Sequence, residues 1–232
     1  NVRIMIIRAV PNGDERDKDI ANAIRYAVDN GASVINMSFG KYYSPEKNVV
    51  DEAAKYAQSK NVLIIHAAGN ESKNKDKEEN YPSRKLESGE VLTNWMEIGV
   101  NSSKKGKKVV APFSNYGKVN VDLFAPGVEI YSTIPNNKYI NESGTSMAAP
   151  SATGVAALLL QYFPELKPTE LKDVLIKTAV PYSGKVNVPG LYKKRLLRKS
   201  KKAVRKKFNT LSVSGGFINA NAAAKELLKS KK

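Results

Sequence analysis

The chain has 232 residues, 41% of them hydrophobic and 8% aromatic, which is enough to bury one substantial core. It has no cysteine, which excludes a disulfide framework and a thiolate metal site. The longest apolar run, 155–160, is far shorter than the roughly 18 residues of a spanning helix, so we expect no membrane span.

The formal net charge of +16 raises the question of an anionic partner such as nucleic acid. Ten Lys or Arg residues and no acidic residue lie between positions 193 and 207. Runs of this kind are typical of solvated loops or tails, so we predict a basic insertion at about 185–210. Only Tyr192 and Phe208 flank the run, which supplies few aromatic rings for base stacking. Nucleic acid is therefore an open alternative and not the expected partner.

Strand and helix signals alternate along the first third of the chain. They predict, in order, a strand at 2–10, a helix at 17–30, a strand at 33–37, a helix at 45–59 and a strand at 62–67. The first helix has an apolar stripe, and Asn30-Gly31 ends it. This alternation indicates an α/β fold with three layers, α/β/α, around a mainly parallel sheet.

The rest of the chain continues the pattern after a polar surface loop at 71–89. It predicts strands at 91–100 and 119–124, then helices at 146–162, 168–178 and 216–228. The helix at 146–162 is nearly all small or apolar, which is typical of a buried central helix. Thr169 is the predicted N-cap of the helix that follows it. We expect residues 1–232 to form a single domain.

The strongest chemical signal is the segment Gly144-Thr145-Ser146-Met147-Ala148-Ala149-Pro150, which places a serine in the first turn of the buried helix. Unpaired backbone N–H groups at a helix N-terminus favour the negative charge that develops when a hydroxyl attacks a carbonyl. Taken alone, a serine at a helix start is most often a simple N-cap. The residues on either side decide between these interpretations.

This segment, followed by Ser151-Ala152-Thr153-Gly154, resembles the nucleophile segment of the subtilisin family of serine peptidases. The resemblance implies that Ser146 is the nucleophile. Upstream, Ala67-Ala68-Gly69-Asn70-Glu71 is similar to the family's oxyanion-hole segment. It implies that Asn70 donates to the oxyanion and that Ala68 and Gly69 border the substrate.

A third match is the strand that ends in Ser38-Phe39-Gly40, similar to the family's substrate-binding strand. The resemblance implies that these three residues pair with an extended polypeptide. Gly13, Asp14 and Glu15 occupy the place of the opposite substrate-binding edge. Residues 214–222 are similar to the start of the family's closing helix, so the resemblance covers nearly the whole chain.

The family takes its catalytic aspartate and histidine from segments that have no counterpart in residues 1–232. We therefore expect the chain to be the C-terminal part of the catalytic domain, without the N-terminal strands, and inactive without the missing N-terminal half. The single histidine, His66, lies inside a predicted apolar strand. The sequence favours a packed histidine with one satisfied nitrogen over a catalytic base.

The resemblance implies a serine endopeptidase that acts on polypeptides and is secreted or held at the cell envelope. The alternative is a pseudoprotease that binds polypeptides without cutting them. The chain has no dense carboxylate loop, so we expect no metal and no other cofactor.

Overall fold

The computed structural model describes residues 2–195 and 198–229. Six strands form one sheet in the order β1-β2-β3-β4-β10-β7, and only the β10–β7 pair is antiparallel. These strands are β1 (Val34–Met37), β2 (Leu63–Ala67), β3 (Trp95–Asn101), β4 (Leu123–Pro126), β7 (Val180–Pro181) and β10 (Gly216–Phe217). Because β2 and β3 are covered on both sides, their side chains are almost all buried.

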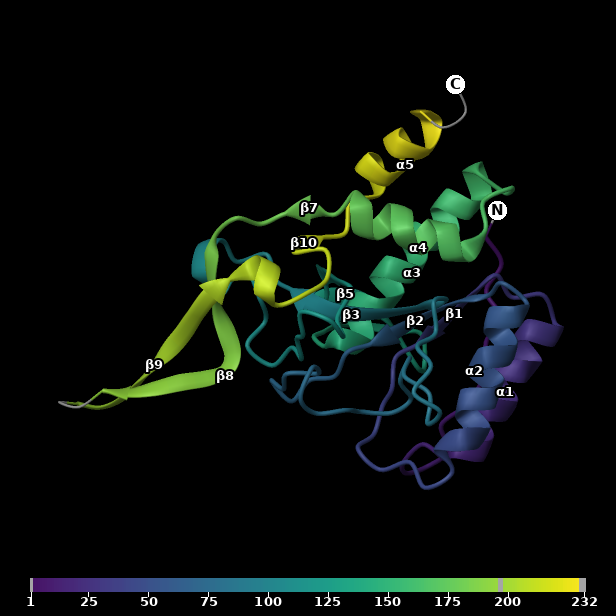
Figure 1. The fold of residues 1–232 in the computed structure, drawn as a ribbon, viewed down its shortest axis with the longest axis horizontal. Helices are drawn as coiled ribbons and strands as arrows, with labels where there is room; N and C mark the ends of the chain where they lie inside the picture. The colour runs from purple at the N-terminus through teal and green to yellow at the C-terminus, as the bar shows by residue number, and fades with distance from the viewer. Residues whose placement is uncertain (1, 196–197, 230–232) are drawn as a thin grey trace.

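Helices cover the two faces of this sheet (Figure 1), which gives the three-layer α/β/α arrangement predicted from the sequence. One face carries α1 (Asp17–Asp29) and α2 (Lys47–Ser59), which lie side by side. The other carries α3 (Thr145–Tyr162), with α4 (Pro168–Lys177) and α5 (Ala220–Lys229) packed beside it. Within the described residues, no helix is both long and apolar enough to span a membrane.

Small residues hold α3 close to the sheet. Ala148, Ala149, Ala152 and Ala156 are fully buried and recur at the spacing of one helix face. They pack against β2 and β3 side chains in one continuous core. Close-packed cores resist displacement, so the start of α3 is held rigidly at the edge of the sheet.

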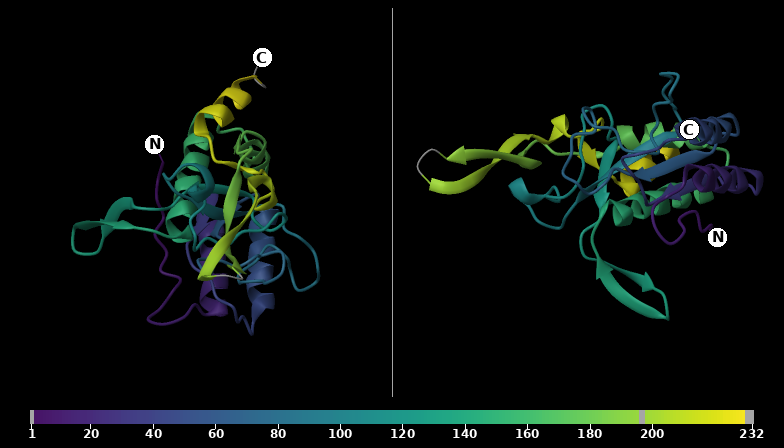
Figure 2. Two further views of the ribbon diagram at one scale, coloured as in Figure 1. Left: turned by 90° about the vertical axis from the view of Figure 1, so that its left-hand side faces the viewer. Right: turned by 90° about the horizontal axis from the view of Figure 1, so that it is seen from below.

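Two hairpins project from this body in different directions (Figure 2). One joins β5 (Ile130–Ile134) to β6 (Lys138–Glu142), and the other joins β8 (Lys185–Arg195) to β9 (Arg198–Lys207). Two short 3₁₀ helices, η1 (Gly106–Lys108) and η2 (Phe208–Thr210), complete the described elements.

The prediction of a strand at 2–10 is wrong. These residues have no regular secondary structure, and Ile4 and Ile6 are 86% and 91% exposed. Within the described structure the sheet ends at β1, so no neighbouring strand accepts the backbone hydrogen bonds of this segment. An apolar run without a pairing partner cannot form a strand.

The basic run predicted as a loop is also different, because most of it lies in β8 and β9. Val186, Val188 and Phe208 at the base of this hairpin are buried in the core, so the base of the hairpin is anchored to the body of the protein.

Smaller corrections concern element ends. The strands expected at 91–100 and 119–124 begin later, at Trp95 and Leu123, and the helix expected at 216–228 begins at Ala220, after β10. The N-cap of α4 is Lys167, whose N–H donates to Glu170, whereas the Thr169 hydroxyl donates to Asn61.

Candidate functional site

Ser146 lies at the start of α3, where the helix meets the turn at Gly144. The N–H groups of Met147 and Ala148 both donate to the Gly144 carbonyl. The N–H of Ser146 has no acceptor within the described part of the chain, as expected for a first-turn amide. The Ser146 hydroxyl donates to the Ser38 carbonyl over 3.0 Å. The helix therefore presents a half-buried hydroxyl and a free amide side by side.

Asn70 is tied to the same helix start through Thr145. The Thr145 backbone N–H, which can only donate, lies 2.8 Å from Asn70 Oδ1, and the Thr145 hydroxyl donates to the same oxygen over 3.0 Å. This pair of donors fixes the orientation of the amide, because Oδ1 must be the acceptor. The Asn70 Nδ2 group makes no hydrogen bond within the described residues and is free to donate.

The loop before Asn70 has no room for a side chain at position 69. Gly69 has a left-handed φ of +103°, and a Cβ there would come within 2.4 Å of Asn115 Nδ2. Its N–H donates to the Thr145 hydroxyl over 3.1 Å. Ala68 is fully buried, and its carbonyl accepts from the side-chain amides of Asn80 and Asn115. The predicted residues Ala68, Gly69 and Asn70 are therefore brought to Ser146 as one rigid unit.

Asn115 is a supporting residue that no sequence motif indicated. It is 1% exposed, and its Oδ1 accepts from the N–H groups of Glu71 and Lys73. Its own N–H donates to the Gly69 carbonyl over 2.9 Å. One side chain thus braces both sides of Asn70. The available signal was an Asn-Tyr-Gly turn in an otherwise apolar stretch.

Glu71 is held by Tyr42 as well as by Asn115. Burial raises the pKa of Tyr42, and its 2.6 Å hydrogen bond to Glu71 raises it further. Tyr42 therefore stays protonated and keeps donating to the carboxylate that follows Asn70.

Ser38, Phe39 and Gly40 continue from β1 toward Ser146. The carbonyl of Ser38 accepts from the Ser146 hydroxyl, and the next carbonyl, of Phe39, turns away to His66. The N–H of Phe39 and both backbone groups of Gly40 have no partner within the described residues. Such unpaired groups are available to an added strand.

His66 is fully buried, and both ring nitrogens are hydrogen-bonded. Nε2 lies 2.8 Å from the Phe39 carbonyl and Nδ1 lies 3.0 Å from Glu97 Oε1. A carbonyl only accepts, so Nε2 carries a proton. Neither nitrogen faces Ser146, so the structure places a packed histidine here, with two satisfied nitrogens where the sequence analysis expected one.

Glu97 lies at the centre of a buried ionic cluster behind this strand. It also accepts from Trp95 Nε1 over 3.0 Å and pairs with Lys75 over 3.0 Å. Burial acts to raise the pKa of Glu97, but the charges of Lys75 and His66, together with the hydrogen bond to His66, outweigh it and lower the pKa to about 2. Glu97 is therefore ionised and holds His66 against Phe39.

The predicted opposite edge, Gly13, Asp14 and Glu15, lies in an irregular segment before α1. Lys41, next to Gly40, donates to the Glu15 carbonyl and pairs with Asp17, both over 2.7 Å. Burial tends to raise the pKa of Asp17, yet hydrogen bonds from Lys41, Ser44 and the Glu46 N–H hold it below its usual range. The Lys41 side chain therefore links the two predicted substrate-binding edges. Gly13 and Asp14 are exposed and make no such link.

No three His, Cys, Asp or Glu side chains gather closely enough to hold a metal ion in the part of the chain that the structure describes. The geometry is instead that of a hydroxyl, a free backbone amide and an oriented side-chain amide next to unpaired strand backbone.

Comparison with known families agrees with this geometry. The subtilase family model matches residues 1–215. The chain belongs to the subtilase family. A thermophilic serine proteinase from Bacillus sp. (strain AK1) is 38% identical over 185 residues, which is 79% of this chain and 42% of that protein. A cell wall-associated protease from Bacillus subtilis (strain 168) is 41% identical over 77% of this chain and 18% of its own length.

Solved protease structures share the fold. The prenylagaramide maturation protease PagA has a TM-score of 0.67 at 27% identity, with 94% of this chain and 69% of that chain covered. A cold-adapted subtilisin-like serine proteinase has a TM-score of 0.62 at 31% identity, with 73% and 57% covered. The chain thus spans well under two thirds of the length of the first two curated relatives.

Proposed function

We propose that these residues form the nucleophile and oxyanion-binding part of a serine endopeptidase. Ser146 attacks the carbonyl of a peptide bond, and the resulting oxyanion is stabilised by the Ser146 N–H and the Asn70 side-chain amide. The observation that carries this proposal is the orientation of Asn70, whose oxygen is occupied by Thr145 while its NH₂ group stays free. A plain N-cap serine would need no such partner.

The substrate lies as an extended strand between Ser38-Phe39-Gly40 on one side and Gly13-Asp14-Glu15 on the other, with Ala68 and Gly69 at the reacting carbonyl. Main-chain pairing gives this kind of site its affinity for polypeptides in general. Support comes from the unpaired backbone groups at Phe39 and Gly40.

The proton acceptor for Ser146 comes from sequence outside these 232 residues. The chain has one histidine, and both nitrogens of His66 are engaged elsewhere. The Ser146 proton points at a carbonyl, which cannot take it. A hydroxyl without a base is a weak nucleophile, so the chain by itself is inactive. The N-terminal half that carries the base also supplies the strands next to β1.

The lack of a base for Ser146 within these residues also favours a second candidate, a pseudoprotease that binds polypeptides and leaves them intact. In that case Ser146 and Asn70 would be retained without catalytic use.

The site of action is proposed to be outside the cell or in its envelope, with support from the cell wall-associated relative.

Cleavage of an unfolded protein substrate tests the proposal. A longer form of the protein, with the sequence that precedes residue 1, should cleave it, and Ser146→Ala should abolish the cleavage. Asn70→Ala should lower kcat by about 10²- to 10³-fold, a magnitude that comes from subtilisin itself and is adopted for this relative. Binding of the substrate without any Ser146-dependent cleavage would favour the pseudoprotease.

A further inference from the structure

The positive charge of the chain is concentrated in two segments. Residues 104–108 and 185–207 contain 15 of the 38 Lys and Arg residues and no acidic residue. The other 23 nearly balance the 22 Asp and Glu residues. Almost the entire formal net charge of +16 therefore comes from these two segments.

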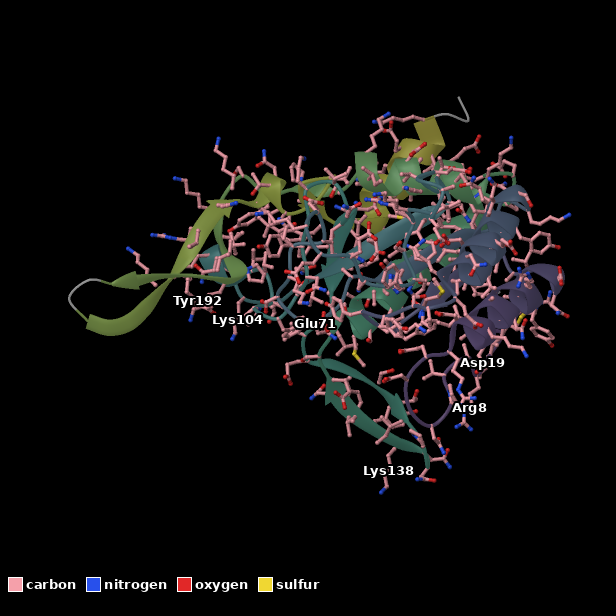
Figure 3. The ribbon with its side chains drawn as sticks, turned by 60° about the horizontal axis from the view of Figure 1, so that its bottom comes forward. Arg8, Asp19, Glu71, Lys104, Lys138 and Tyr192 are labelled. Carbon is pink, nitrogen blue, oxygen red and sulfur yellow. The ribbon has the colours of Figure 1, made fainter. Side chains whose placement is uncertain are left out.

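The fold joins the two segments into one surface, which we call the basic arm. η1, with its lysines, contacts β8, and Val109 and Val110 share a core with Val186 and Val188. Lys104 lies at the root of the hairpin and Tyr192 on the hairpin itself (Figure 3). β9 has ten residues at roughly 3.3 Å each, so the arm reaches about 33 Å from its base.

Where the structure describes its side chains, the charge of the arm is not neutralised within the protein. Of the described residues, Lys202, Arg205, Lys206 and Lys207 are exposed, as are the four lysines at 104–108, and none of them forms an ion pair. Residues of like charge also face each other in the strand register: Lys185 and Lys207, Lys193 and Lys202, Lys194 and Lys201, and Arg195 and Arg198. Like charges opposite each other weaken a hairpin that is already marginal on its own. An anionic ligand would remove this repulsion.

The root of the arm lies beside the candidate site. Gly190 of β8 has a left-handed φ of +68°, and a Cβ there would lie 2.8 Å from the carbonyl oxygen of Ser72. Ser72 follows Asn70 by two residues, on the loop that Asn115 braces. A ligand bound along the arm therefore lies next to a chain held at Ser146.

We propose that the basic arm is a secondary binding site for an acidic segment of the polypeptide substrate, outside the bond that is cut. That the ligand is a polypeptide substrate rests on the proposed function. That the arm is the binding site rests on its charge and on its position beside Ser146. Nucleic acid fits less well, because Tyr192 is the only aromatic residue between 185 and 207 and single-strand binding depends on stacked rings.

Peptide binding to the chain with Ser146→Ala tests the site without any cleavage. We expect a fluorescent twelve-residue Glu/Ser peptide to bind, a Gln/Ser peptide of the same length not to bind, and the affinity to fall as NaCl rises from 50 to 500 mM. The triple variant K202E/R205E/K206E should bind at least tenfold more weakly. A control with the same change in net charge, K18E/K60E/K225E, should change the affinity less than twofold. Circular dichroism checks that both variants fold.

Three results would overturn the inference: no binding of the acidic peptide, an equal loss in both triple variants, or tighter binding of a DNA oligonucleotide of equal charge. The last would assign the arm to nucleic acid. In the longer, cleaving form, the arm variant should raise KM only for substrates with an acidic segment. If the longer form binds the acidic peptide but cleaves nothing, the proposed function is wrong and the binding role of the arm still holds. If it cleaves substrates but its binding does not depend on the arm, the binding role is wrong and the proposed function still holds.

Discussion

Thr145 is the residue that joins the two halves of the candidate site. Its backbone and hydroxyl orient Asn70, and the hydroxyl also accepts from Gly69, 76 positions away in sequence. The site thus depends on one buried threonine, whose hydroxyl makes two contacts and whose backbone N–H makes a third between α3 and the loop after β2.

Replacing Thr145 by valine keeps the shape of the side chain and removes these hydroxyl contacts. The Gly69 N–H would lose its partner, at a cost of about 1–3 kcal/mol in the free energy of unfolding. Urea denaturation measures the change, with the exposed Thr133→Val as control. A loss below about 0.5 kcal/mol would mean that the network does not hold the loop.

Glu97 gives the stability of the fold a defined acid dependence. Its folded pKa is about 2, below the ordinary value of 4.5. A depressed carboxyl pKa stabilises the fold above the unfolded pKa, and that contribution is lost as the pH falls from about 4.5 toward 2. We expect the free energy of unfolding to fall by a few kcal/mol over this range.

Glu97→Gln removes the titrating group and leaves Lys75 and His66 without their anion. Breaking a buried pair in this way costs about 3–5 kcal/mol at neutral pH. The variant should also show a flatter stability profile between pH 4.5 and 2 in urea denaturation. A profile as steep as that of the unchanged protein would assign the acid dependence to other carboxylates.

Several candidate site residues are indicated by short sequence motifs, whereas the residues that support them in the structure are not. Ser146 and Asn70 lie in contiguous, family-specific segments, whereas Asn80, Asn115 and Glu97 act from other loops and strands. Contacts that depend on which strands become neighbours have no local signal. The buried partners of His66 are of this kind.

At the scale of elements, apolar periodicity predicted the helices and central strands because burial decides them. It failed at 2–10, where the apolar pattern is present and the pairing strand is not. It also failed for β8 and β9, whose charges suggest a loop although Val186, Val188 and Phe208 anchor the strands. Pairing depends on the neighbour as much as on the sequence of the strand itself.

The segment 2–10 should contribute little to the stability of this chain. Ile4→Glu and Ile6→Glu each change an exposed side chain, so the free energy of unfolding should stay within about 0.5 kcal/mol. Ile64→Ala, in the fully buried β2, should cost about 2–5 kcal/mol as a positive control. Thermal unfolding followed by circular dichroism distinguishes these cases, and a large loss at Ile4 or Ile6 would show that the segment is packed.

In the longer form the same two substitutions should become costly. Strands that pair at the free edge of β1 would bring this segment into the sheet, and a buried unpaired carboxylate is strongly destabilising. If the two substitutions change the free energy of unfolding equally little in both forms, the proposed completion of the sheet by upstream strands is contradicted.

At the scale of the whole molecule, a nearly neutral body carries a separate basic arm. Replacing residues 193–202 by Asn-Gly removes seven positive charges and leaves the buried anchors in place. The shortened chain should fold with a melting temperature within a few degrees of the original, since Val186, Val188 and Phe208, which pack into the core, remain. Loss of folding would show that the arm is structural.

We propose that Ser146 has a formed oxyanion site in these residues and a base outside them. Labelling by a fluorophosphonate probe, read by mass spectrometry at Ser146, tests it most directly. We expect no rapid labelling of Ser146 in the 232-residue chain, and rapid labelling of Ser146 in the longer form that is lost in its Ser146→Ala variant. Rapid Ser146-dependent labelling of the 232-residue chain would contradict the claim, because it requires a base within these residues.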